Sequence, residues 1–195
     1  MPTDKTFLPL RGNYRSLLVY QKAECIYDVT YYFAHKFLER GDRTIDQMVQ
    51  AARSGKQNIA EGCAASTMSR ETELKLINVA KASLQELIID YEDYLRVRDL
   101  KQWLPTDPRY QQTRAVLAIH NDSAFYREAI KTRSAETIAN IAITLIHQTD
   151  TMLVRLLERL KRNFVQQGGI REEMFKARQN YRNNNRQNGG GGKNL

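Results

Sequence analysis

The chain has 195 residues, of which 42% are hydrophobic and 27% charged. This length and composition fit one ordinary globular domain and argue against a wholly disordered chain or a membrane protein. The formal net charge of +8 is unevenly distributed: residues 1–150 carry 20 Lys and Arg against 19 Asp and Glu, whereas residues 151–195 carry 10 against 3. A nearly neutral N-terminal part followed by a basic C-terminal segment predicts that this segment is an arm that binds a polyanion.

The N-terminal residues 1–13 contain two prolines and a glycine and are expected to form an irregular leader. They have no apolar segment that could serve as a secretory signal, and no apolar run approaches the ~20 residues of a transmembrane helix. We therefore expect a cytoplasmic protein without a membrane partner. A helical stripe of apolar residues then predicts a first helix from about residue 14 to 39.

Aromatic residues thicken this first stripe. We interpret them as core or as a subunit interface, because a base-stacking surface would need exposed rings beside basic residues. The residues concerned are Tyr20, Tyr27, Tyr31 and Tyr32.

The second helix, about residues 44–63, is expected to begin at a capping box formed by Thr44 and Gln47. Beside its apolar stripe runs a second line of small and polar residues, which predicts burial on two sides. Glycine at position 55 lowers helix stability relative to alanine, so we expect it to be there because another backbone approaches closely. Gly62 is expected to end the helix. The second line consists of Ala51, Ser54, Gly55, Asn58 and Glu61.

The third helix is predicted over about residues 70–98 with Ser69 as its N-cap. An insert over residues 103–133 follows, in which Asp107 and Pro108 open a short accessory helix reaching about Asn121. Ser134 is expected to cap the last long helix, which ends at Gly168. A short basic helix over about residues 171–182 then leads into a low-complexity tail, NNNRQNGGGGKNL, that is expected to be disordered.

No segment alternates with period two, so the fold class is predicted to be all-α. Four long amphipathic helices joined by mostly short links indicate an antiparallel up-down four-helix bundle over residues 14–165, with residues 166–195 as a basic tail.

Residues suited to catalysis or metal binding are sparse. The chain lacks the Glu-x-x-His repeats of di-iron bundles and contains no phosphate-binding loop or zinc-finger spacing, so we expect no cofactor, no metal and no enzyme. His147 and Asp150, three residues apart, could share a metal only with ligands from another helix. Three carboxylates are expected near the interior, satisfied by neighbours, and two cysteines are expected as buried thiols. The carboxylates are Glu61, Glu86 and Asp90, and the cysteines are Cys25 and Cys63.

The clearest functional signal is basic. Cations recur at three- and four-residue steps opposite the leucine face of the last long helix and continue beyond it, as in a surface that binds phosphate backbones. Met174 and Phe175 form too small an apolar face for a membrane-surface helix. The alternative interpretation is a solvated face and a soluble tail. The candidate nucleic-acid-binding residues are Arg155, Arg159, Lys161, Arg162, Arg171, Lys176, Arg178, Arg182 and Arg186.

Two motifs carry a family resemblance. The first motif is Ala51-Ala52-x-Ser54 with Asn58-Ile59-Ala60-Glu61-Gly62, and the second is Ala80-x-x-Ser83-Leu84-x-Glu86-Leu87. Together they resemble the four helix bundle family typified by proteins encoded in intervening sequences of bacterial 23S rRNA genes. That family includes the accessory variability protein of diversity-generating retroelements, and this chain is most similar to its longer members with a C-terminal extension.

The resemblance implies a four-helix protomer that assembles into a homopentamer and, as in the retroelement members, binds nucleic acid and a protein partner. It assigns structural roles to the motif residues Ser54, Asn58, Glu61, Gly62, Ser83 and Glu86. The chain departs from the family pattern at Gln50, Gly55 and Ala82 and in its insert. We therefore expect a self-assembling, non-enzymatic bundle that binds RNA or DNA; the alternative is a protein-binding scaffold that assembles along the line through Ser54 and Gly55.

Overall fold

The computed structural model describes residues 13–188, and every regular element in this range is a helix, which confirms the all-α class for the described residues. Most of the expected leader and the end of the expected tail, residues 189–195, lie outside this range. The elements are η1 (Tyr14–Ser16), α1 (Leu18–Phe37), α2 (Arg43–Ala65), α3 (Arg70–Arg96), α4 (Pro108–Ile119), α5 (Ser123–Ile130), α6 (Ala135–Gln167) and α7 (Ile170–Asn188).

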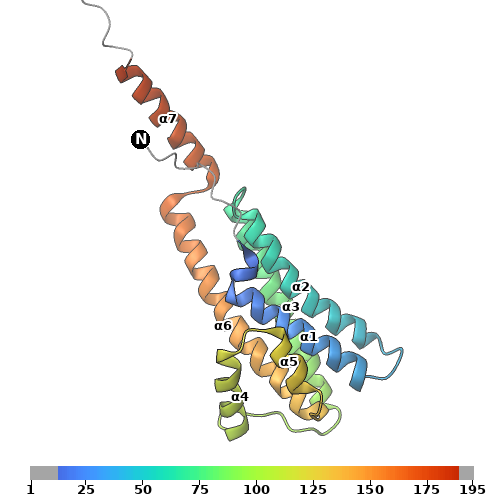
Figure 1. Cartoon of the computed structure of the whole chain (residues 1–195). Helices are drawn as coiled ribbons and strands as arrows, with labels where there is room; N and C mark the ends of the chain where they lie inside the picture. The colour runs from blue at the N-terminus through green and yellow to red at the C-terminus, as the bar shows by residue number, and fades with distance from the viewer. Residues whose placement is uncertain (1–12, 189–195) are drawn as a thin grey trace, which may run out of the picture.

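Four long helices enclose one hydrophobic core. Helix α1 packs against α2, α2 against α3, α3 against α6, and α6 against α1, so each contacts two others (Figure 1). Fully buried side chains from all four fill the space between them, among them Phe33, Ile59, Leu84 and Leu145. The Tyr91 hydroxyl, buried in this core, donates to Thr30 Oγ1 at 3.0 Å, so neither polar group is left without a partner.

The interface between α2 and α3 depends on glycine. A Cβ atom at Gly55 would lie 2.6 Å from Cδ2 of Leu84, whereas the nearest backbone atom, the Ala80 oxygen, would be 3.7 Å away. The close approach at Gly55 is therefore made by a side chain of the same chain. Gly62 does not end α2, which continues to Ala65; it is buried, and a Cβ there would lie 3.2 Å from Ile77. The predicted role of Gly62 as a terminator was wrong because its lack of a side chain serves packing.

Local capping signals set most helix ends. Ser69, Asp107 and Ser134 each accept a hydrogen bond from a backbone N–H in the first turn of their helices, as predicted. Gly168, at φ +77°, ends α6 in the conformation that glycine tolerates best. The predicted cap at Thr44 was wrong: Asp42 Oδ1 accepts from the Thr44 backbone N–H at 2.8 Å and begins α2 two residues earlier.

The insert between α3 and α6 forms two helices, α4 and α5, of which the sequence predicted only the first. Helix α4 packs on α6, and α5 packs on α1. Lys22 of α1, although 3% exposed, donates to the backbone oxygens of Leu117 and His120, so burial of its ammonium is compensated by hydrogen bonds to the insert. Leu117, Tyr126 and Ile130 join the main core. The insert is therefore a covering layer for α1 and α6.

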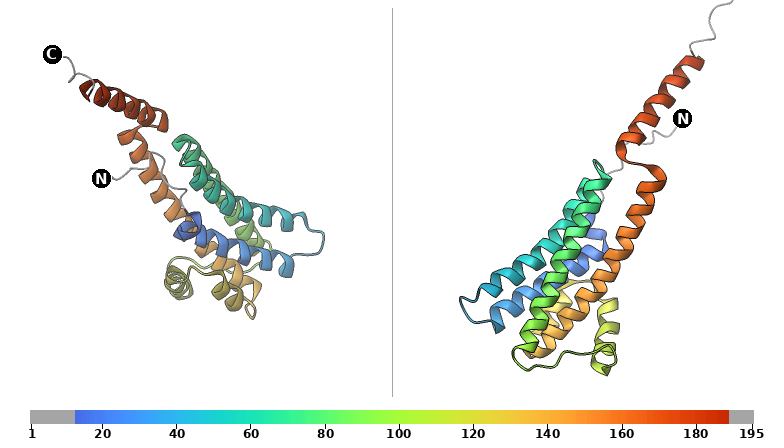
Figure 2. Two further views of the ribbon diagram at one scale, coloured as in Figure 1. Left: turned by 45° about the horizontal axis from the view of Figure 1, so that its top comes forward. Right: turned by 180° about the vertical axis from the view of Figure 1, so that it is seen from behind.

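Helix α7 projects beyond the end of the four packed helices, and the additional views in Figure 2 agree with Figure 1 on this point. It extends to Asn188, six residues beyond the predicted end of the short basic helix at about residue 182. The junction before it is fixed to α3, because Arg70 Nη1 donates to the Gly168 oxygen at 2.8 Å. Within residues 13–188, no helix is long and apolar enough to cross a membrane.

Candidate nucleic-acid interface

The second half of α6 presents a row of arginines to solvent. Arg155, Arg159 and Arg162 are all exposed, and their spacing places them on one side of the helix; Lys161 is exposed as well. The buried Leu153 and Leu157 lie on the opposite side and attach this part of α6 to the core. The structure thus brings Arg155, Arg159 and Arg162 of the predicted basic surface together, while Lys161 projects from another side of the helix, about 100° around it from Arg162.

These cations have few acidic neighbours. Among the described residues, none of the four α6 cations has a carboxylate oxygen within 4.0 Å. This holds also for the carboxylate of Glu158, which is exposed on the same helix. Glu73 of α3 interacts electrostatically with one of the four cations: burial raises the pKa of its carboxyl, and the charges of Arg70 and Arg159 partly oppose that shift. The positive charge of this surface is therefore largely available to an external anion.

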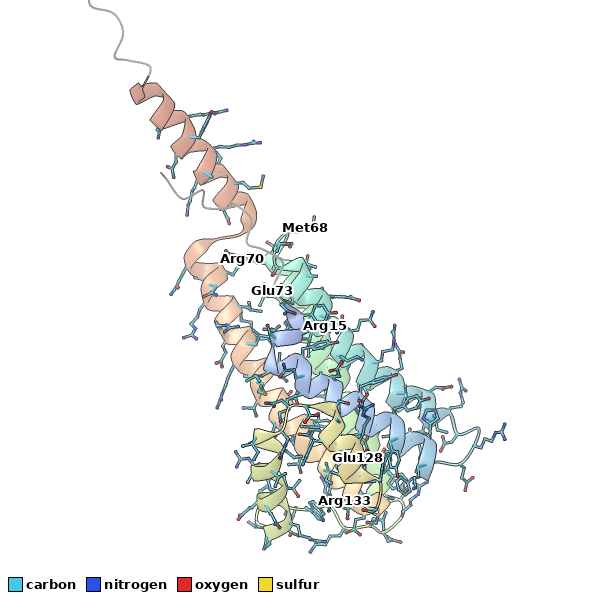
Figure 3. All side chains as sticks on the ribbon, in the orientation of Figure 1. Arg15, Met68, Arg70, Glu73, Glu128 and Arg133 are labelled. Atoms are coloured by element: carbon cyan, nitrogen blue, oxygen red, sulfur yellow. The ribbon has the colours of Figure 1, made fainter. Side chains whose placement is uncertain are left out.

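Helix α7 carries further exposed cations. Lys176, Arg178 and Arg182 are exposed on it. Arg171 and Arg186 also belong to α7, but their side chains lie outside the part of the chain that the structure describes. Figure 3 shows that Met68, Arg70 and Glu73 of the α2–α3 turn and the start of α3 lie at the end of the molecule from which α7 projects.

Apolar side chains accompany these cations. Phe175 and Tyr181 are 62% and 70% exposed, and Met174 is also exposed. Met174, Tyr181 and the two arginines Arg178 and Arg182 line a hollow of about 450 Å³. The apolar part of α7 is larger than the sequence indicated, because Tyr181 adds to Met174 and Phe175.

The family-motif residues lie elsewhere, between α2 and α3. The Ser54 and Ser83 hydroxyls are hydrogen-bonded at 2.9 Å across the two helices, and Asn58 Nδ2 donates to the Ser54 oxygen at 2.9 Å and to its hydroxyl at 3.1 Å. With Gly62 packed on Ile77, three of the six motif residues, Ser54, Gly62 and Ser83, contact the neighbouring helix, and Asn58 supports Ser54 from the same helix. Their role in this structure is packing within one chain.

The carboxylates of this region differ from the prediction. Glu61 and Glu86 are exposed, so their predicted position near the interior was wrong, because both project from the sides of α2 and α3 that face away from the core. Asp90 is half-buried; burial and the nearby Asp93 and Glu86 raise the pKa of its carboxyl. Glu86 and Asp90 line a hollow of about 660 Å³ together with Ser54 and Ser83.

The candidate metal and thiol residues are dispersed. Within the described residues, no three His, Cys, Asp or Glu side chains are grouped as a metal site. His147 is exposed, and Asp150 lies 3.4 Å from Lys81 Nζ. Cys25 is buried, and burial raises the pKa of its thiol to about 12. Cys63 is only partly buried, which corrects the prediction for that residue.

The aromatic set on α1 divides into two environments. Tyr20, Tyr27 and Tyr32 are half-buried against the core, as expected, whereas Tyr31 is 50% exposed. Helical periodicity did not indicate this difference, because it does not show where the insert stops covering α1.

No protein-family model, curated protein or solved structure matches the chain. The resemblance to the four helix bundle family therefore stays a prediction, carried by the motif residues of α2 and α3.

Proposed function

We propose that the protein is a non-enzymatic helical bundle that binds RNA or DNA through a basic surface on the second half of α6 and on α7. The observation that carries this proposal is the row of exposed arginines, Arg155, Arg159 and Arg162, which have no ion-pair partner among the described residues. Such a row attracts phosphates regardless of sequence, because each contact releases condensed counterions from the nucleic acid.

The proposal predicts a steep dependence of affinity on salt. In the purified full-length protein, replacing Arg155, Arg159 and Arg162 with alanine should weaken binding to generic single- and double-stranded nucleic acid. The slope of log affinity against log salt should fall by about 2–3, because each lost phosphate contact removes about 0.7–0.9 from it. Deleting Gly168 to Leu195 should weaken binding further, by roughly 10²-fold at low salt.

A matched control removes the same charge from another part of the surface. Arg96, Arg98 and Arg109 are also exposed, but Arg96 pairs with Asp93 and Arg109 with Asp107. Replacing these three arginines with alanine should leave the salt slope close to that of the unaltered protein. Equal losses in both triple variants would mean that net charge, and not the α6 surface, drives binding, and unchanged affinity after deletion of the tail would remove α7 from the proposal.

Self-assembly is part of the same proposal. We infer that the ring of contacts among α1, α2, α3 and α6 is an antiparallel up-down four-helix bundle, and that copies associate, as a homopentamer if the family resemblance holds. Val79 and Ile89, exposed apolar residues of α3, support a further contact surface. Light scattering of the purified protein measures the mass that decides this point; a monomer at all concentrations would contradict assembly.

The alternative is a protein-binding scaffold. The exposed apolar residues Met174, Phe175 and Tyr181 of α7 favour it, because a projecting helix of this kind is stabilised by a partner. Gly55 gives it no support, since the chain's own Leu84 occupies the space beside it. Absence of nucleic-acid binding at low salt, together with a stable protein complex that requires Phe175 and Tyr181, would favour this alternative.

A further inference from the structure

A second surface combines exposed rings with positive charge, and it lies on α1 far from the basic C-terminal surface. Tyr27, Tyr31 and His35 follow one another at four-residue steps along the helix. The ring centroids of Tyr27 and Tyr31 are 6.2 Å apart, and those of Tyr31 and His35 are 4.2 Å apart with planes tilted by 31°. Tyr31 and His35 are exposed, so this is a ladder of aromatic rings at the surface.

The ladder borders a groove of about 700 Å³ between α1 and the end of α5, which we call the tyrosine groove. Ile130 and Tyr32 give it an apolar lining, and the Tyr32 hydroxyl donates to the Lys131 oxygen at 3.2 Å, which ties the two sides of the groove together. Its shape is thus set by contacts within the fold.

Cations surround the rings. Lys36, Arg127 and Lys131 line the groove, and Lys56 Nζ lies 4.3 Å from the centre of the Tyr27 ring. Lys36 Nζ lies 5.3 Å from the centre of the Tyr32 ring and has no carboxylate within 4.0 Å among the described residues.

Two carboxylates offset part of this charge. Asp28 accepts a hydrogen bond from Ser123 and lies 4.0 Å from Arg127 Nε, and Glu128 pairs with Lys131 at 2.6 Å. Among the residues that line the groove, the three cations Lys36, Arg127 and Lys131 outnumber the one carboxylate, that of Asp28, so the lining has a net positive charge.

We propose that the tyrosine groove binds single-stranded nucleic acid, with a base stacked against the Tyr31–His35 ladder and phosphates beside Lys36 and Lys131. Aromatic rings beside cations form the usual platform for unpaired bases, because every base has a face that can stack and every nucleotide carries a phosphate. Bases in a duplex are stacked on one another and do not reach such a ring. The inference rests on the proposed function for the class of partner, but it assigns a separate site.

The position of the groove separates it from the first surface. Figure 3 shows Glu128 and Arg133, which flank the end of α5, at the end of the molecule opposite Met68 and Arg70. Because α7 projects from the latter end, substitutions in the groove and in the tail can be tested independently.

The experiment compares Tyr31→Ala with Tyr31→Phe in the full chain, using fluorescently labelled oligothymidylate, oligouridylate and a DNA duplex. Tyr31→Ala removes the ring and should weaken single-strand binding about tenfold, as for loss of one stacked base, without changing the salt slope. Tyr31→Phe keeps the ring and should bind like the unaltered protein. Neither variant should change duplex binding. The fold should survive both, because Tyr31 is half exposed.

The outcomes separate this inference from the proposed function. If Tyr31→Ala changes neither duplex nor single-strand binding, the proposed role of the tyrosine groove is contradicted, while the proposed role of the basic C-terminal surface is retained. A protein that binds no nucleic acid at low salt would overturn both. A change in the mass of the Tyr31→Ala protein in solution would show that this face joins two copies of the chain, and would also overturn the inference. Single-strand binding that survives deletion of the tail but depends on the Tyr31 ring would support it.

Discussion

The two halves of α6 have the same helical periodicity but different surroundings. In the first half every residue from Ile138 to Ile146 is buried, because α4 and the chain leading to it cover the side of the helix that faces away from the core. In the second half the corresponding side carries Arg155, Arg159 and Arg162 and is exposed. An amphipathic stripe therefore shows which side meets the core, while a covering segment decides whether the other side meets water.

Polar residues in the buried half are satisfied locally. The Thr144 hydroxyl donates to the Asn140 oxygen at 2.7 Å, and the Thr149 hydroxyl donates to the Leu145 oxygen at 2.8 Å, each one helical turn back. Gln148 and Asn140 reach outside the helix: Gln148 Nε2 donates to the Arg114 oxygen of α4 at 2.8 Å, and the Asn140 side chain accepts from the Trp103 backbone N–H at 2.7 Å and donates to the Lys101 oxygen at 2.8 Å. Asn140 thus attaches the start of the insert to α6.

The largest difference between the two halves is expected for leucine truncation. Leu145→Ala empties a fully buried site and should lower the free energy of unfolding by about 2–5 kcal/mol. Leu156→Ala, on the partly exposed half, should cost about 1–2 kcal/mol, because part of that side chain already contacts water. Urea denaturation of the two variants measures both values, and equal losses would contradict the contrast.

A smaller effect is expected at Asn140. Asn140→Ala leaves the Trp103 N–H buried without its partner and should lower the free energy of unfolding by about 1–3 kcal/mol. Asn163→Ala is the matched control, since Asn163 is exposed on the second half of the same helix and should change stability by less than about 0.5 kcal/mol. A neutral Asn140→Ala variant would mean that the insert is held by its apolar contacts alone.

The smallest effect concerns Glu73, which faces the basic half. Because burial raises the pKa of its carboxyl in the folded protein, the folded state binds more protons than the unfolded state between the unfolded value near 4.5 and the raised value. Stability attributable to Glu73 should therefore fall as the pH rises through this window. Glu73→Gln should remove that fall and stabilise the protein at neutral pH by about 0.5 kcal/mol. Denaturation midpoints from pH 4 to pH 7 test this; a steeper fall in the variant would contradict the sign.

The candidate surfaces were predictable to different degrees. Arg155, Arg159 and Arg162 could be placed on one side of a helix from their spacing, because the leucines opposite them fix which side faces the core. Tyr31 could not be distinguished from Tyr27 and Tyr32, since the exposure of each ring depends on where α5 ends. Glu61 and Glu86 were misplaced for a different reason: a polar residue at the edge of an apolar stripe can point toward the core or toward solvent.

The sequence by itself determined the helical class and the helix ends at Ser69, Asp107, Ser134 and Gly168, because capping and glycine conformation act within a few residues. Only the tertiary structure decided the second helix of the insert, the burial of Lys22 beneath it and the use of Gly55 and Gly62 to admit Leu84 and Ile77. Those features depend on contacts between segments distant in the chain, which local pattern does not specify.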